Sequence, residues 1–303
     1  MSQHPMIEDP VAFHVGWQKA ASTTLQFDLF AQHSEVSNLG KPSESSDFYR
    51  YILWTEAADY DGAKSHAIWQ ETVAPNLVEG KVPVYSYENF ATLPGIDRTL
   101  AAQRLANLFP NGRAILLIRN QISLLESLFT HLLVTGKVFG TFEDWLRAQL
   151  AFPYNTFVTH ARFFEIYDLY RRLFGVDRVL VLLFEDLQGD KDTFARHLSE
   201  FLHIDKTETT TLLSGAGKRK SRQSRWNALI HQNKALAALD SRLRPLLPAE
   251  PRRFLRRALD HRMPAPTTWP PALRRELSDY YRAGNRRLAT ELGLPLERYA
   301  YPL

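Results

Sequence analysis

The sequence predicts an α/β fold, in which helices flank a central, mainly parallel sheet and a helical extension follows at the C-terminal end. Three runs of mostly apolar residues, 11–15, 114–118 and 178–187, have the composition of strands buried on both faces, which is typical of parallel sheets. A loop and a helical pattern follow each run, as in α/β folds. With 303 residues, 45% of them hydrophobic, the chain can bury a large core. We expect one domain, with a core over about residues 11–222 and a helical, basic extension over about 223–303.

The segment after the first run, G-W-Q-K-A-A-S-T-T-L at residues 16–25, joins that strand to a helical pattern. N–H groups at the start of a helix are unpaired and carry partial positive charge, so a loop of small residues there can hold an anion. Lys19 adds a full positive charge, and Ser22 and Thr23 add hydroxyl donors. A Walker loop is not predicted, because its lysine directly precedes the hydroxyl residue, whereas Lys19 stands three residues before Ser22.

The second run leads directly into Arg119, and a helical segment then carries Ser127, eight residues after the arginine. An arginine suits a phosphate because its planar donor fork makes two parallel, charge-assisted hydrogen bonds. Taken alone, the pattern also fits an arginine at the sheet edge and a serine on an exposed helix face.

Together the two segments resemble the nucleotide motifs of sulfotransferases that use 3′-phosphoadenosine 5′-phosphosulfate (PAPS). The family's 5′-phosphosulfate loop reads roughly P/Q-K-[ST]-G-T-T. The resemblance implies a P-loop-like three-layer fold and a cofactor-binding loop made of Gln18, Lys19, Ala20, Ala21, Ser22, Thr23 and Thr24. Ala21 replaces the family's glycine, which matters if the loop needs a positive φ there, because only glycine adopts it without strain.

The family's 3′-phosphate motif, R-N-P-x-x-R-x-x-S, matches at Arg119 and Ser127 and departs at Gln121 and Leu124. A third similar segment is the Phe-Glu-Asp-Leu that ends the third strand, whose two acids we expect to be structural caps or ion partners. The sequence G-K-R-K-S-R at residues 217–222 resembles a loop of glycosaminoglycan-type members that folds over the nucleotide. It makes Lys218 and Arg222 further candidates for cofactor binding.

The residue that takes the acceptor's proton is less determined. Residues 82–90 read as a strand running into a loop, where bacterial sulfotransferases often carry S-x-E, and the glutamate here is Glu88. Strand ends of an open α/β sheet face the ligand crevice, so Glu88 is expected to project toward the transferred group. The alternative is a carboxylate that caps the next helix. Glu44 is the rival base, because glycosaminoglycan-type members place a glutamate near that region, and His66 is the next residue to test.

Aromatic residues gather over residues 49–70, where helical spacing favours a place in the core over a surface that stacks on sugar rings. Residues 271–292 are expected to form a last helix, with an extended tail over 299–303. Residues 218–263 hold thirteen Lys or Arg against three acids, a segment that suits a membrane surface, an anionic acceptor or plain solvation. No motif supports nucleic acid as a partner.

No stretch approaches the ~18 apolar residues of a membrane span, and the first ten residues lack the pattern of a signal peptide. We therefore expect a cytoplasmic protein. The chain has no cysteine and no paired-histidine spacing, so the sequence gives metal catalysis no support.

The resemblance implies an enzyme that moves a sulfuryl group from PAPS to an acceptor hydroxyl, with a carbohydrate or glycoconjugate such as a glycolipid as acceptor. Lys19 and the loop N–H groups would stabilise the leaving oxygen of the product adenosine 3′,5′-bisphosphate, and Glu88 would accept the proton, without a metal. Two other classes stay open. A small-molecule kinase would need a Walker lysine and a magnesium-binding acid, and a non-catalytic protein would bind anionic polymers through the basic segment.

Overall fold

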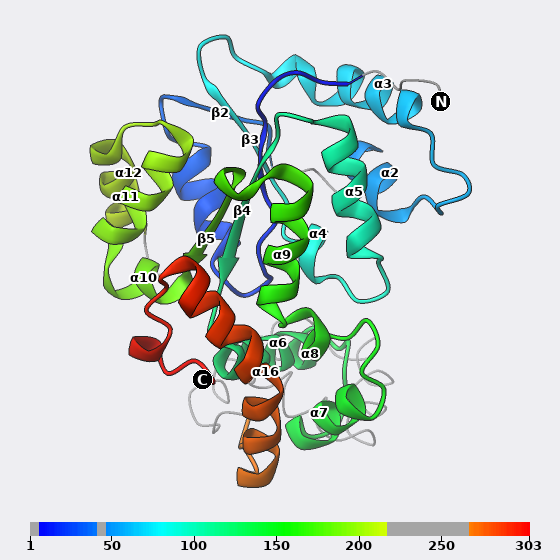
Figure 1. Cartoon of the computed structure of the whole chain (residues 1–303), viewed down its shortest axis with the longest axis vertical. Coiled ribbons are helices and arrows are strands. Elements are labelled where there is room, and N and C mark those ends of the chain that lie inside the picture. Colours follow the sequence, from blue (N-terminus) through cyan, green and yellow to red (C-terminus); the bar gives the residue numbers. More distant parts are fainter. Residues whose placement is uncertain (1–5, 41–46, 217–266) are drawn as a thin grey trace, which may run out of the picture.

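The structure, a computed structural model, describes residues 6–40, 47–216 and 267–303. Its five strands form one sheet in the order β2-β3-β1-β4-β5, and each neighbouring pair is parallel. The strands are β1 (Ala12–His14), β2 (Val36–Asn38), β3 (Val82–Ser86), β4 (Arg113–Ile118) and β5 (Val179–Leu183). The predicted α/β fold with a parallel sheet is therefore confirmed (Figure 1).

Helices connect the strands. The first half of the chain contains α1 (Ser22–Thr24), the π-helical η1 (Leu25–Phe30), α2 (Asp47–Trp54), α3 (Gly62–Thr72), the short η2 (Ala74–Asn76), α4 (Asn89–Thr92) and α5 (Arg98–Leu108). After β4 come α6 (Gln121–Val134), α7 (Phe142–Ala151), α8 (Phe157–His160), α9 (Phe163–Phe174), η3 (Val176–Arg178), α10 (Phe184–Gly189), α11 (Lys191–Leu202), α12 (Lys206–Gly215), α16 (Pro271–Leu292) and η5 (Glu297–Tyr299).

The helices form two layers, one on each face of the sheet. On one face α9 packs on β4 and β5 and contacts both α5 and α16. On the other face α12 contacts η1, and α11 contacts β5. Right-handed crossovers explain this division, because the connection from β1 to β2 crosses the sheet in the opposite direction to the connection from β3 to β4. In Figure 1 α9 lies in front of the sheet, and the carboxyl ends of the strands point downward, toward α6.

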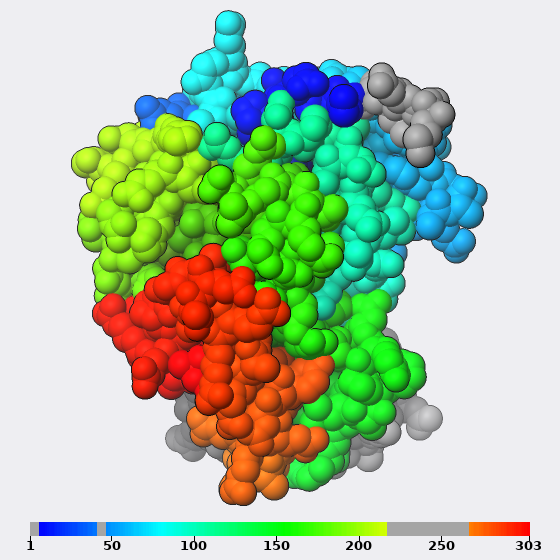
Figure 2. Space-filling view, in the orientation of Figure 1, coloured from blue at the N-terminus to red at the C-terminus, as the bar shows by residue number. Residues whose placement is uncertain are grey.

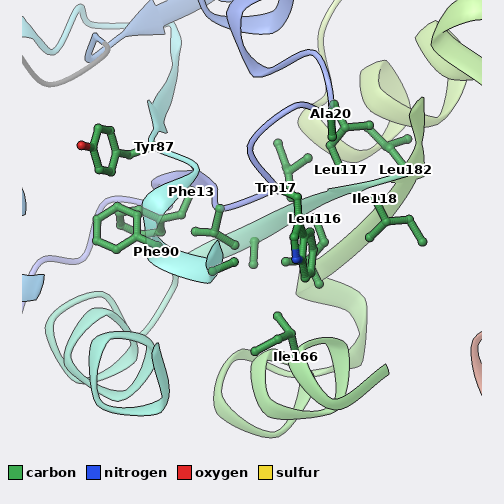
Figure 3. Packing of buried hydrophobic residues seen from close by; sticks show 14 of the residues in the cluster. Phe13, Trp17, Ala20, Tyr87, Phe90, Leu116, Leu117, Ile118, Ile166 and Leu182 are labelled. Carbon is green, nitrogen blue, oxygen red and sulfur yellow. The ribbon is translucent and has the colours of Figure 1, made fainter. Parts of the chain in front are cut away.

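The sheet core extends into the loop that follows β1. Residues 114–118 of β4 are at most 1% exposed, as a strand buried on both faces requires. Trp17, in the loop, is equally buried, and its ring packs edge-on against Phe163 of α9 with the ring centroids 4.7 Å apart. Figure 3 shows Trp17 and Ala20 lying against Leu117 and the neighbouring residues of β4. The loop is therefore anchored in the core at both ends of its turn.

The C-terminal helix has the predicted bounds, Pro271–Leu292. Proline suits the first helical position, and Gly293, with a φ of 63°, ends the helix in the left-handed region. The hydroxyl of Tyr281 donates to the carbonyl of Val158 at 2.9 Å, so α16 is bonded to the core. Figure 2 shows α16 and the last residues, in orange and red, covering one side of the molecule beside α9.

Two expectations need adjustment. The third strand ends at Leu183, and Phe-Glu-Asp-Leu forms the first turn of α10, where acids favour a helix start. Among the aromatic residues of segment 49–70, Trp69 is fully buried as expected, but Trp54 is 56% exposed. None of the described helices combines the length and apolar composition needed to cross a bilayer.

Candidate active site

Three neighbouring parallel strands bring the predicted site residues to one edge of the sheet. The loop 16–21 follows β1, Glu88 follows β3, and Arg119 follows β4. Hydrogen bonds tie these segments together. The side-chain amide of Gln18 donates to Oδ1 of Asn89 at 2.7 Å, and Nη1 of Arg119 donates to the carbonyl of Lys19 at 2.9 Å. Residues 71 and 100 positions apart in the chain thus meet at the carboxyl edge.

The backbone of the loop is strained at two positions. Lys19 has a φ of 66° and Ala21 a φ of 63°, both in the left-handed region that glycine favours. The loop does need a positive φ at Ala21, where the family has glycine, and a non-glycine residue in this conformation costs roughly 1–2 kcal/mol. Such strain is often found at functional sites.

The same turn leaves a set of backbone donors without partners. The N–H of Ala20 bonds the carbonyl of Trp17 at 3.2 Å and closes the turn. The N–H groups of Lys19, Ala21 and the first two residues of α1 donate to none of the residues that the structure describes. Because they surround a helix start beside an ammonium group, they form a cradle suited to a phosphate or sulfate.

The loop side chains differ from the prediction in one respect. The hydroxyl of Ser22 is buried and donates to the carbonyl of Trp17 at 3.3 Å, because the tight turn brings the two together. The sequence had indicated that this hydroxyl is available to a ligand, but in the structure it is already engaged with Trp17. Thr23 is exposed and Thr24 is half-buried. Ala20 is fully buried and its N–H already bonds Trp17, so it offers no donor to a ligand.

Basic groups crowd this edge. Burial, and then the charge of Arg119, lower the pKa of Lys19. Burial also lowers the pKa of Arg119, which the nearby carboxylate of Glu185 partly offsets. His131 of α6 has a pKa lowered by burial and then by the charges of Lys19 and Lys137. An anion bound between these groups would relieve their mutual repulsion.

The Arg119 side chain is held from several directions. Its Nε donates to Oγ of Ser123 at 2.9 Å, and its guanidinium lies over the ring of Phe184, 4.6 Å from the centroid. Ser127 lies one helical turn beyond Ser123 on α6 and is half-buried, and its hydroxyl bonds none of the described residues. Ser123 was missed in the sequence. The sequence signal that could have found it is Asn120, a residue type that often begins a helix. Its side chain caps α6 by accepting from the N–H of Ser123 at 3.4 Å, and this helix start brings Ser123 close to Arg119.

The two acids after β5 brace this segment. Oε1 of Glu185 accepts the N–H of Asn120 at 2.9 Å, and Oε2 accepts the hydroxyl of Tyr301 at 2.8 Å. Oδ1 of Asp186 accepts the hydroxyl of Tyr299 at 2.5 Å. The acids have a structural role as expected, but within the described residues they neither cap α10 nor form ion pairs, and instead join the C-terminal residues to the start of α6 by hydrogen bonds.

Glu88 stands just before α4 without capping it, so the capping alternative is wrong. The carboxylate is half-buried, and its Oε2 accepts a hydrogen bond from the amide of Gln26 at 3.1 Å. His66 lies in the middle of α3, which Figure 1 places toward the opposite, amino edge of the sheet, so its position does not suit the base. Glu44, Lys218, Arg222 and the basic segment 218–263 lie outside the described residues.

This arrangement of a parallel sheet between two helix layers is similar over its whole length to that of a solved sulfotransferase. The crystal structure of a sulfotransferase from Alicyclobacillus acidocaldarius superposes with a TM-score of 0.57 at 14% identity, covering 97% of this chain and 99% of that one. At this identity the similarity shows the fold alone.

Sulfotransferase domains from the Synechococcus PCC 7002 olefin synthase and from the curacin biosynthetic pathway give TM-scores of 0.45 and 0.44, at 16% and 13% identity. The alignments cover 92% and 95% of this chain and 98% of each domain. No protein-family model and no curated protein matches the sequence.

Proposed function

We propose that this chain is a PAPS-dependent sulfotransferase that acts on an acceptor hydroxyl, with a carbohydrate or glycoconjugate as the acceptor class. The observation that carries the proposal is the meeting of Lys19, Arg119 and a cradle of backbone N–H groups that have no partner among the described residues, at the carboxyl edge of a sheet with the sulfotransferase fold. Crowded, partly buried cations beside free donors favour a ligand with more than one anionic group.

PAPS fits these residues because it carries two separate anionic ends. In the proposal the loop from Gln18 to Thr24 holds the 5′-phosphosulfate, and Arg119 holds the 3′-phosphate with Ser127. The hydrogen bond from Arg119 to the carbonyl of Lys19 supports this division, since it fixes the distance between the two anion positions. Lys218 and Arg222 remain candidates for additional contacts with the nucleotide.

PAPS supplies an activated sulfuryl group. As the bond from the acceptor oxygen to sulfur forms, the bond from sulfur to the bridging phosphate oxygen breaks, and the leaving nucleotide keeps that electron pair. Lys19 and the loop N–H groups stabilise the charge that grows on the bridging oxygen. Glu88 accepts the proton of the acceptor hydroxyl. This chemistry uses no metal.

The proposal is tested by a sulfuryl-transfer assay with labelled PAPS and a panel of carbohydrate and glycolipid acceptors. Glu88→Gln keeps the shape but loses the basicity, so kcat should fall by about 10²–10⁴ while the KM for PAPS barely changes. Glu44→Gln is the matched control and should stay within about tenfold of the wild-type rate. A large loss at Glu44 with a small one at Glu88 would reverse their roles, and no transfer to any acceptor would contradict the proposed function.

The proposal also includes a cytoplasmic location and a contact of the basic segment with an anionic acceptor or with a membrane surface. The composition of residues 218–263 supports the contact with an anionic partner, because the segment holds thirteen cationic side chains against three acids. Sedimentation with anionic and with neutral lipid vesicles separates the two partners, because a segment that binds only a soluble acceptor leaves both vesicle types uncoated.

A further inference from the structure

A buried polar network lies beneath the loop and leads to Glu88. Nδ1 of His14, the last residue of β1, is 2.7 Å from Oγ of Ser86, the last residue of β3, and both side chains are fully buried. The carbonyl of Ser86 accepts a hydrogen bond from Nε2 of Gln26 at 3.4 Å. The same Nε2 donates to Oε2 of Glu88 at 3.1 Å. The network therefore joins the two central strand ends to the candidate base through one amide.

The orientation of Gln26 is fixed by its partners. A carbonyl and an ionised carboxylate can only accept hydrogen bonds. The donor end of the amide must therefore face Ser86 and Glu88. The acceptor end, Oε1, is buried and has no hydrogen-bond partner among the described residues. A glutamine that is only 2% exposed thus leaves one end unsatisfied while its donor end serves Glu88.

The surroundings of this amide are closely packed. Gln26 lies in the first turn of η1, and π-helical turns of this kind are rare and concentrate at functional sites. Gly16 lies directly over His14, because a Cβ atom at that position would be 2.9 Å from Nε2 of the imidazole. The loop that carries Lys19 and the amide that contacts Glu88 are therefore supported by the same histidine and serine.

We propose that Gln26 is a positioning residue that orients the Glu88 carboxylate for proton transfer. Its N–H donates to one carboxylate oxygen and leaves the other to receive the acceptor's proton. The inference rests on the proposed function, because it gives Glu88 the role of base. Its physical basis is that a donor to an ionised carboxylate makes a strong, directional hydrogen bond, and that a base acts only from within hydrogen-bond reach of the proton.

The first test separates the hydrogen bond from the reaction. Gln26→Glu puts a second carboxylate against Glu88 and should lower the melting temperature. Combining Gln26→Glu with Glu88→Gln restores a donor facing an acceptor, so the double variant should melt above Gln26→Glu alone. This readout needs no activity. A double variant that melts no higher than the single one would show that the two side chains do not interact, and the proposal would fall.

The second test addresses positioning. Gln26→Met has a similar length without the donor, and it should lower kcat about tenfold, the loss of one charge-assisted hydrogen bond, with the KM for PAPS within about twofold. In the Glu88→Gln background the same substitution should leave kcat unchanged, because Gln26 acts only through Glu88. An unchanged kcat in Gln26→Met, or an equal loss in both backgrounds, overturns the positioning role. If Glu88→Gln itself keeps full rate, the assignment of the base fails, and the positioning role fails with it.

Discussion

The Lys19 loop and the Arg119 segment follow neighbouring strands and carry one cation each, yet they are built differently. The loop contains two non-glycine residues with positive φ and leaves several N–H groups without described partners. The Arg119 segment enters a regular helix capped by Asn120, and its guanidinium is bonded to Ser123 and stacked on Phe184. Strain and N–H groups without described partners therefore gather where charge changes in the proposed reaction, whereas the Arg119 guanidinium, assigned to the spectator phosphate, is already held in place by its neighbours.

The largest effect that this comparison predicts is at Lys19. Lys19→Ala removes the charge beside the bridging oxygen, so kcat should fall by about 10²–10³, as for the loss of one donor that stabilises a transition state. The KM for PAPS should rise less, because the backbone cradle remains. Single-turnover transfer with saturating PAPS measures this directly. A kcat within about twofold of wild type would show that the strained loop is not where charge develops.

The opposite pattern is expected at Arg119. Arg119→Ala removes a charge-assisted partner of the 3′-phosphate, so the KM for PAPS should rise about 10- to 100-fold with a smaller change in kcat. Arg119→Lys is the matched control, and it should recover only part of the loss because a lysine lacks the planar fork. An unchanged KM in Arg119→Ala would mean that the match to the 3′-phosphate motif is accidental.

Acid should weaken the loop side more than the Arg119 side, because two buried histidines support the loop. His14 lies under Gly16, and the carbonyl of His160 accepts the indole N–H of Trp17 at 3.0 Å. Burial lowers the pKa of His14 to about 4, and burial with the charge of Arg98 lowers that of His160 to about 3. Unfolded histidine titrates near ~6.5, so between these values the unfolded chain binds more protons.

The stability that these histidines contribute is therefore complete above pH ~6.5 and is lost as the pH falls toward the folded-state values. Each of these histidines, neutral in the folded protein, should make the unfolding free energy about 1.4 kcal/mol lower at pH ~5.5 than at pH ~7.5. Urea unfolding of the wild type and of His160→Gln at both pH values measures the difference. The variant should lose less than the wild type by about 1.4 kcal/mol, the contribution of one histidine. Equal losses would mean that His160 is not held neutral in the folded protein.

The smallest effect is the release of strain at Ala21. Ala21→Gly should raise the unfolding free energy by about 1 kcal/mol, because glycine adopts the positive φ without a Cβ clash. Ala20→Gly is the matched control in the same loop. Its φ is not in the left-handed region, and the substitution should lower stability by about 0.5–1 kcal/mol. Equal changes at the two positions would remove the argument for local strain.

The elements that the sequence predicted are those with local signals. Residues 114–118 are a continuous apolar run and lie in β4. The final helix begins with a proline and ends before a glycine, and these residues mark its two bounds in the sequence. The carboxyl-edge position of Glu88 was predicted because strand ends of an open α/β sheet face the ligand crevice, and Lys19 and Arg119, which also follow strands, lie at the same edge.

The missed contacts join residues far apart in the chain. Gln26 meets Glu88 across 62 residues, and Tyr301 meets Glu185 across 116. Neither pair has a periodicity or spacing that a sequence displays. Gln121, which departs from the family's proline, has an explanation of the same kind. Its side-chain amide pairs with that of Asn285 on α16 at 2.7 Å, 164 residues away.

The central claim is that the carboxyl edge of the sheet binds the nucleotide of PAPS, and thermal unfolding with adenosine 3′,5′-bisphosphate tests it most directly. At ~100 times its Kd this ligand should stabilise the protein by about 2.7 kcal/mol, whereas 5′-AMP, which lacks the 3′-phosphate, should stabilise it much less. The difference between the two ligands should disappear in Arg119→Ala. Equal shifts for the two nucleotides would contradict the account. A larger shift with ATP and magnesium would favour a kinase, and a shift with a heparin-like polymer alone would favour a binding protein.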